Sequence, residues 1–86
     1  MKVTGQQKED NSFKPFSITI EFERLEEADG FFMLMNDPVI SEILIGASCN
    51  FPTSKIRDAM KQGGYEYNNS AWYHYRNSRD KVMNRK

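Results

Sequence analysis

The chain has 86 residues, and its 12 lysines and arginines balance its 12 aspartates and glutamates. Only 38% of the residues are hydrophobic but 13% are aromatic, so a few large rings must supply much of the core. A chain of this length leaves no room for a second core, and its single cysteine excludes an intrachain disulfide and a cluster of metal-binding cysteines.

The balanced net charge hides a polarised chain. Residues 1–50 carry a net charge of −5, and residues 51–86 carry a net charge of +5. Opposite charge at the two ends steers partners and permits self-association. We therefore expect a binding protein without a cofactor. A protein is the favoured partner, nucleic acid is the alternative, and a homo-oligomer is a further possibility.

Residues 1–12 are polar and lack a periodic apolar pattern, which predicts a flexible leader. They also lack the apolar stretch of a signal peptide, and the apolar runs elsewhere fall far short of a bilayer span. We therefore expect no membrane association. A cytoplasmic location follows, and it suits a chain with a single cysteine.

The order of the first elements follows from the hydrophobic period. Apolar and polar residues alternate from Phe16 to Glu23, which predicts a strand over residues 16–23 with one wet face. The period then becomes helical, and helices are predicted over residues 25–36, 38–47 and 54–62. Asp37, followed by proline, is a typical start of the second helix, and two glycines end the third.

The segment after the glycines crowds aromatic residues around an Asn-Asn-Ser turn. This pattern predicts a β-hairpin over residues 65–76 that pairs with the first strand. The alternative is a helix that begins at Ser70. Residues 77–86 are then a basic tail or a short helix. The whole pattern predicts a single α+β domain over residues 13–76, with three helices on one face of an antiparallel sheet.

Pairing between the hairpin and the first strand has an electrostatic consequence. It would place Arg76 or Arg79 opposite Glu21 or Glu23. The two charged halves would then neutralise each other in part, and each exposed pair would contribute about 0 to 1 kcal/mol.

The side chains that catalysis needs are scarce. His74 has no second metal ligand near it in sequence, and Cys49 lies in a loop without a cationic neighbourhood. Glu26 and Glu27 are ordinary acids for the first turn of a helix, and Gly63-Gly64 lacks a phosphate-binding pattern around it. We therefore expect that the protein is not an enzyme and has no metal site.

The first candidate surface is a protein-binding one in the aromatic segment. Tyrosine, tryptophan and arginine most often dominate the energy of protein interfaces. The segment supplies seven such side chains, namely Tyr65, Tyr67, Trp72, Tyr73, Tyr75, Arg76 and Arg79. The alternative is that Trp72 and some of the tyrosines complete the core.

Two further surfaces follow from charge. The third predicted helix, with the hairpin behind it, resembles a winged helix-turn-helix that would bind DNA through Lys55, Arg57, Lys61 and Gln62. The acidic half could instead present a negative surface to a basic groove. This surface would consist of Glu21, Glu23, Glu26, Glu27 and Asp29. In both cases the alternative is an ordinary solvated surface.

The stretch ITIEFE, residues 18–23, is followed by EEAD, residues 26–29, and a short apolar helix. This opening resembles that of many small bacteriophage-encoded accessory proteins. The resemblance is architectural and assigns a role to no residue. It implies a small, cytoplasmic, non-catalytic protein that binds and redirects a host factor or a competing viral factor.

Overall fold

The computed structural model describes residues 1–5, 13–49 and 52–84. These residues form a small α+β domain whose elements, in chain order, are β1 (Lys2–Gly5), β2 (Ile18–Glu21), α1 (Leu25–Met35), α2 (Pro38–Gly46), α3 (Thr53–Gln62) and α4 (Asn69–Met83). The two strands form one antiparallel sheet. None of the described helices combines the length and the hydropathy that crossing a membrane requires.

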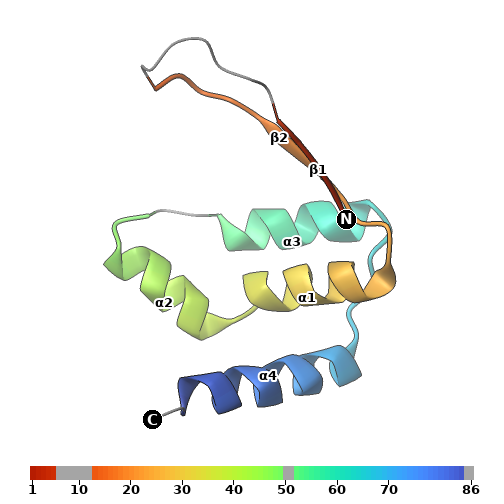
Figure 1. Ribbon diagram of the computed structural model, residues 1–86, viewed down its shortest axis with the longest axis vertical. Coiled ribbons are helices and arrows are strands. Elements are labelled where there is room, and N and C mark those ends of the chain that lie inside the picture. Colours follow the sequence, from red (N-terminus) through yellow and green to blue (C-terminus); the bar gives the residue numbers. More distant parts are fainter. Residues whose placement is uncertain (6–12, 50–51, 85–86) are drawn as a thin grey trace.

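Helix α1 is the centre of the helical body. It lies between α3 and α4 and also contacts α2 (Figure 1). In the described part of the chain, the buried apolar side chains are Phe32, Met33 and Met35, all on α1. The rings of Tyr65 and Tyr67 pack on Phe32, with centroid distances of 4.8 and 5.9 Å. The core is therefore one helix covered from several sides.

Several ends of the first three helices follow the predicted signals. At the start of α1, the side chain of Glu27 accepts hydrogen bonds from the backbone N–H groups of Glu23 and Arg24, at 3.0 and 3.1 Å. Asp37 caps α2. Gly64 follows α3 with φ = +106°, a left-handed conformation that favours glycine and turns the chain back towards α1. The three predicted helices are thus confirmed.

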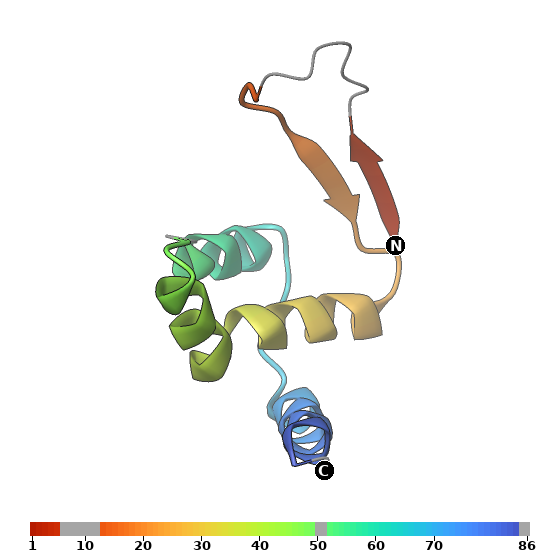
Figure 2. The same ribbon diagram turned by 60° about the vertical axis from the view of Figure 1, so that its left-hand side comes forward.

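The sheet differs from the prediction. The predicted strand over residues 16–23 is confirmed over Ile18–Glu21 only, and its partner is β1, not a C-terminal hairpin. The two-stranded ribbon projects from the helices, so the prediction of three helices on one face of the sheet is wrong (Figure 2). We call β1, β2 and residues 13–17 the arm.

The first strand lies where the sequence predicts a leader. Lys2–Gly5 forms β1, and only Val3 among these four residues is a large apolar one, so the segment carries no visible period of its own. Its pairing is set by β2 instead. The rest of the predicted leader, residues 6–12, lies outside the described residues.

The predicted hairpin over residues 65–76 is wrong, because Asn69–Met83 forms the helix α4. The side chain of Asn68 accepts hydrogen bonds from the backbone N–H groups of Ser70 and Ala71, at 3.0 and 3.3 Å. The Asn-Asn-Ser sequence is therefore a helix cap and not a hairpin turn. The helical alternative was the correct one, and α4 includes most of the predicted tail.

Replacing Phe32 with alanine should lower the free energy of unfolding by about 4 kcal/mol, because it removes the buried ring on which Tyr65 and Tyr67 pack. The matched control is Ile45→Ala on the exposed side of α2, with an expected loss of about 0.5 kcal/mol or less. Urea denaturation followed by circular dichroism measures both. Equal losses in the two variants would contradict this description of the core.

Candidate functional site

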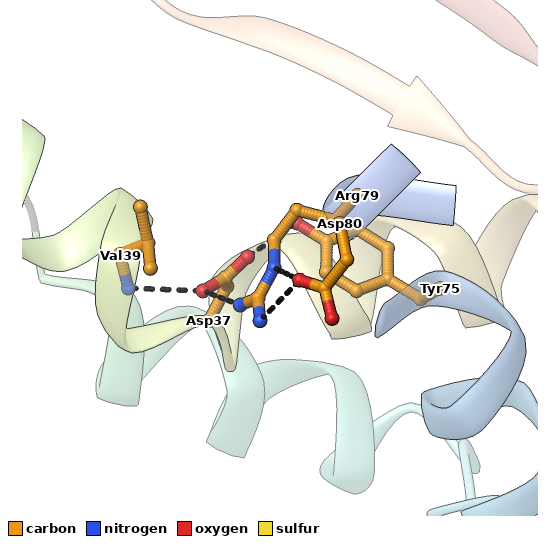
Figure 3. Close-up of polar contacts among 5 residues, drawn as sticks. All are labelled: Asp37, Val39, Tyr75, Arg79 and Asp80. Atoms are coloured by element: carbon orange, nitrogen blue, oxygen red, sulfur yellow. Dashed lines mark hydrogen bonds and ion pairs between the residues drawn. The ribbon is translucent and has the colours of Figure 1, made fainter. Parts of the chain in front are cut away.

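A buried carboxylate at the junction of α1 and α2 positions α4. Asp37 is 0% exposed. Its Oδ1 accepts hydrogen bonds from the backbone N–H of Val39 at 2.9 Å and from Nη1 of Arg79 at 2.7 Å, and its Oδ2 accepts one from the hydroxyl of Tyr75 at 2.9 Å (Figure 3). Asp80 holds the other side of the Arg79 guanidinium at 3.2 Å. We call these five residues the Asp37 cluster.

The Asp37 cluster fixes the rotation of α4 about its axis. A buried carboxylate is costly unless donors surround it, so α4 must turn Tyr75 and Arg79 towards Asp37. These two residues are four apart, which places them on the same side of a helix. The opposite side of α4 is consequently turned away from the body.

Tyr65 is a second internal anchor. Its hydroxyl donates a hydrogen bond to Oδ1 of Asp29 at 2.6 Å and so ties the segment after α3 to α1. Burial, and then this hydrogen bond, raise the pKa of the Tyr65 hydroxyl. In the same way, burial and the hydrogen bond to Asp37 raise the pKa of Tyr75 to about 12. Both shifts therefore have a structural cause.

The seven predicted protein-binding residues do not form one surface. Three of them, Tyr65, Tyr75 and Arg79, bond to carboxylates inside the molecule. Tyr67 lies before α4 and packs edge-on against Phe32, although part of its ring is exposed. These four residues serve mainly to hold the elements together.

The remaining three residues share one flank of α4. Trp72 is half-buried and stacks on Tyr75 with a centroid distance of 5.8 Å. Tyr73 is 63% exposed, and Arg76 is exposed one turn after Trp72. Met83 continues this flank near the end of the helix and is also exposed. We call Trp72, Tyr73, Arg76 and Met83 the α4 stripe.

The ion pairs expected between the C-terminal segment and the first strand do not form in the described structure. Arg79 binds Asp37 instead of Glu21 or Glu23, at 2.7 Å. Arg76 takes part in no ion pair that the structure describes. The two charged halves of the chain are therefore joined at the Asp37 cluster and not across the sheet.

The predicted DNA-binding residues are only partly turned outward. Lys55, Lys61 and Gln62 are exposed on α3. Arg57 is half-buried instead, and its Nη1 donates a hydrogen bond to Oδ1 of Asn36. Its buried Nε has no hydrogen-bond partner among the described residues. The winged-helix prediction also loses its wing, because the segment after α3 leads into α4 and not into a hairpin.

Most of the predicted acidic surface has partners within the chain. Glu23 and Glu27 lie 2.9 and 2.6 Å from the amino group of Met1, and this contact lowers the pKa of Glu27. Of the other three acids, Asp29 accepts the hydrogen bond from Tyr65, Glu26 lies 3.7 Å from Arg24, and Glu21 stands opposite Lys2 in the ribbon. Glu23, Glu27 and Asp29 are thus engaged within the chain, whereas Glu21 and Glu26 remain exposed.

An apolar groove lies at the base of the arm, and the sequence does not predict it. It has a volume of 620 Å³ and is formed by residues 22–24, which join the arm to α1, by the start of α1 and by α3. Its apolar lining includes Phe22, Leu25, Ile56, Met60 and Tyr65. The walls of this groove come from elements far apart in the sequence, so no local sequence pattern predicts it.

Comparison of the chain with protein-family models, with curated proteins and with solved structures gave no match. Among the described residues, no three or more histidine, cysteine, aspartate or glutamate side chains gather where they could hold a metal ion. Function must therefore be inferred from the surfaces described above.

The Tyr75 hydroxyl should make stability sensitive to alkaline pH. Because the folded-state pKa of about 12 lies above the ordinary value of 10.0, the folded state keeps a proton that the unfolded state releases. The stabilisation is complete below pH 10 and is lost as the pH rises through about 12. Urea denaturation at several pH values should show a shallower loss for Tyr75→Phe than for the unchanged protein.

The matched control for this titration is Tyr73→Phe, because the Tyr73 ring is exposed and its hydroxyl forms no hydrogen bond that the structure describes. We expect it to follow the pH dependence of the unchanged protein. A Tyr75→Phe curve parallel to both would contradict the hydrogen bond to Asp37.

Proposed function

We propose that this chain is a non-catalytic protein that binds another protein stoichiometrically, through the α4 stripe. The observation that carries the proposal is the exposure of Tyr73 and Arg76, on a helix whose Tyr75 and Arg79 are already bonded to Asp37. These two side chains contribute nothing evident to the fold. The resemblance to bacteriophage accessory proteins implies the same mode of action, namely the modulation of a host factor by binding.

The composition and spacing of the α4 stripe support a protein partner. Tryptophan, tyrosine and arginine are the residues most enriched among the energetically dominant positions of protein interfaces. Trp72 and Arg76 are four residues apart, so they lie on neighbouring turns of one flank. Met83, at the end of this flank, adds a flexible apolar side chain that adapts to different surfaces.

The arrangement of the titratable groups supports a role without catalysis. The tyrosines with raised pKa values owe them to burial and to hydrogen bonds that join elements of the fold. The side chains of His74 and Cys49 are exposed and take part in no hydrogen bond or ion pair that the structure describes. A nucleophile paired with a base is therefore not evident among the described residues.

Alanine at Tyr73 or Arg76 should reduce capture of the partner by about tenfold or more, as expected for dominant interface residues. The immobilised protein would be exposed to cell lysate, and the captured protein quantified by mass spectrometry. Asn77→Ala, an exposed position one residue beyond Arg76, is the matched control and should capture as well as the unchanged protein. Circular dichroism confirms that each variant retains its helices.

Two outcomes would contradict the proposal. One is capture of the same protein, in the same amount, by the Tyr73→Ala and Arg76→Ala variants. The other is salt-dependent binding to duplex DNA that Lys55→Ala and Lys61→Ala abolish while the α4 substitutions leave it unchanged. The second result would favour α3 as the functional surface.

A further inference from the structure

The chain exposes far more surface than a compact monomer of its size. Its solvent-accessible surface is 7299 Å², whereas a compact protein of 10.1 kDa exposes about 5,300 Å². Its radius of gyration is 15.3 Å, against about 12 Å for a compact domain of 86 residues. The arm contributes to this shape, because it projects from the helical body (Figure 1).

One face of the arm is apolar and largely exposed, although Ile20 at its centre is half-buried. Val3 stands opposite Ile20 in the ribbon, and residues directly opposite each other share a face. Val3 is 61% exposed, and Ile18, on the same face, is 56% exposed. The other face is polar, with Thr4 opposite Thr19. A two-stranded ribbon with an exposed apolar face is marginally stable by itself and needs a further layer.

The apolar face continues into the groove at the base of the arm. Phe22 is the first residue after β2, and its ring packs on Phe31 of α1 with a centroid distance of 5.4 Å. Phe22 also lines the groove, together with Leu25 of α1. At the other end of the arm, the ring of Phe16 is 69% exposed. Each molecule therefore carries an apolar arm and, at the base of that arm, an apolar groove.

We propose that two copies of this chain form a symmetric dimer by reciprocal packing of their arms, apolar face against apolar face. The apolar residues from 16 to 22 are spaced evenly about Thr19. A two-fold axis that passes near Thr19, perpendicular to the strands, sets Ile18 of each arm against Ile20 of the other. It also brings Phe16 of each arm to Phe22 of the other, at the mouth of the groove.

A second copy fits this surface because the surface is complementary to itself. The same face supplies both sides of a two-fold interface, as closed symmetry requires. A stable dimer buries about 800 Å² on each partner. The whole chain exposes about 2,000 Å² more than a compact monomer, and a dimer would bury part of this excess. The dimer also gives each two-stranded ribbon the second layer that it lacks within one chain.

The oligomeric state tests this proposal. Sedimentation equilibrium should give the mass of two chains for the unchanged protein and the mass of one chain for Ile18→Asp, which puts a charge on the apolar face. The matched control is Thr19→Asp, the next residue on the opposite face, which should remain a dimer. A monomeric unchanged protein, or a dimeric Ile18→Asp variant, would overturn the proposal.

Disulfide trapping tests the pairing without charging the arm. In a Cys49→Ser background, Phe16→Cys combined with Phe22→Cys should give a covalent dimer under mild oxidation. The two positions are about 20 Å apart along one strand, so a disulfide between them must join two chains. Each single variant should give much less dimer. Absence of the covalent dimer from the double variant would overturn the proposed pairing.

The dimer and the proposed function fail independently. The α4 stripe lies outside the arm, so the dimer variants leave Tyr73 and Arg76 intact. If a variant of the arm is monomeric but still captures the partner protein, the change affects the arm alone and not the proposed function. Capture of a different protein by the arm of a monomeric chain would also overturn the dimer proposal.

Discussion

The carboxylate of Asp37 is the constraint on which the helical body depends. It is 0% exposed and accepts hydrogen bonds from donors on two separate helices. Removing an ion from water costs several kcal/mol unless other groups replace the water, so this position is stable only while α4 is docked. One buried side chain therefore couples the α1–α2 junction to the last helix.

This coupling determines the surface that the protein presents. Once Tyr75 and Arg79 point at Asp37, Tyr73 lies on the far side of α4 and Arg76 on the exposed flank beside Arg79. A rotation of α4 by one residue would bury Arg76 and expose Tyr75 instead. The outward flank is thus a consequence of the buried cluster, which links the stability of the fold to the proposed binding function.

The arm follows a different physical rule. The helices surround α1, but nothing comparable covers the ribbon, whose apolar face remains open to solvent (Figure 2). Among the described residues the body contains few buried apolar side chains, and exposed large apolar residues occur both on it and on the arm. A dimer of two chains can bury apolar surface that a single chain leaves exposed.

Local signals predicted the parts of the fold that local interactions decide. The helices α1, α2 and α3 follow from hydrophobic period, the cap at Asp37 and the glycines after residue 62. The strand β1 was not predicted because its own four residues show no alternation of apolar and polar side chains. Its pairing with β2 determines its conformation instead. The groove was missed for the same reason, since its walls come from distant segments.

The error in the C-terminal segment shows how tertiary contacts override propensity. Tyrosine and tryptophan favour strands, and an Asn-Asn-Ser sequence suits a turn, but Asn68 serves equally well as a helix cap. The helix gains the contacts of Tyr75 and Arg79 with Asp37, which are 38 and 42 residues away in sequence. Sequence alone singled out these aromatic and arginine residues as candidates, but the rotation of α4 decides which of them face outward.

The most direct test of the central claim is a double-mutant cycle between Asp37 and Arg79. The free energy of unfolding would be measured by urea denaturation for Asp37→Asn, for Arg79→Met and for the two substitutions together. If the buried pair holds α4 to the α1–α2 junction, each single substitution leaves the partner side chain buried without its ion pair. The coupling energy is then about 2 kcal/mol or more. Effects that add to within about 0.5 kcal/mol would contradict the account.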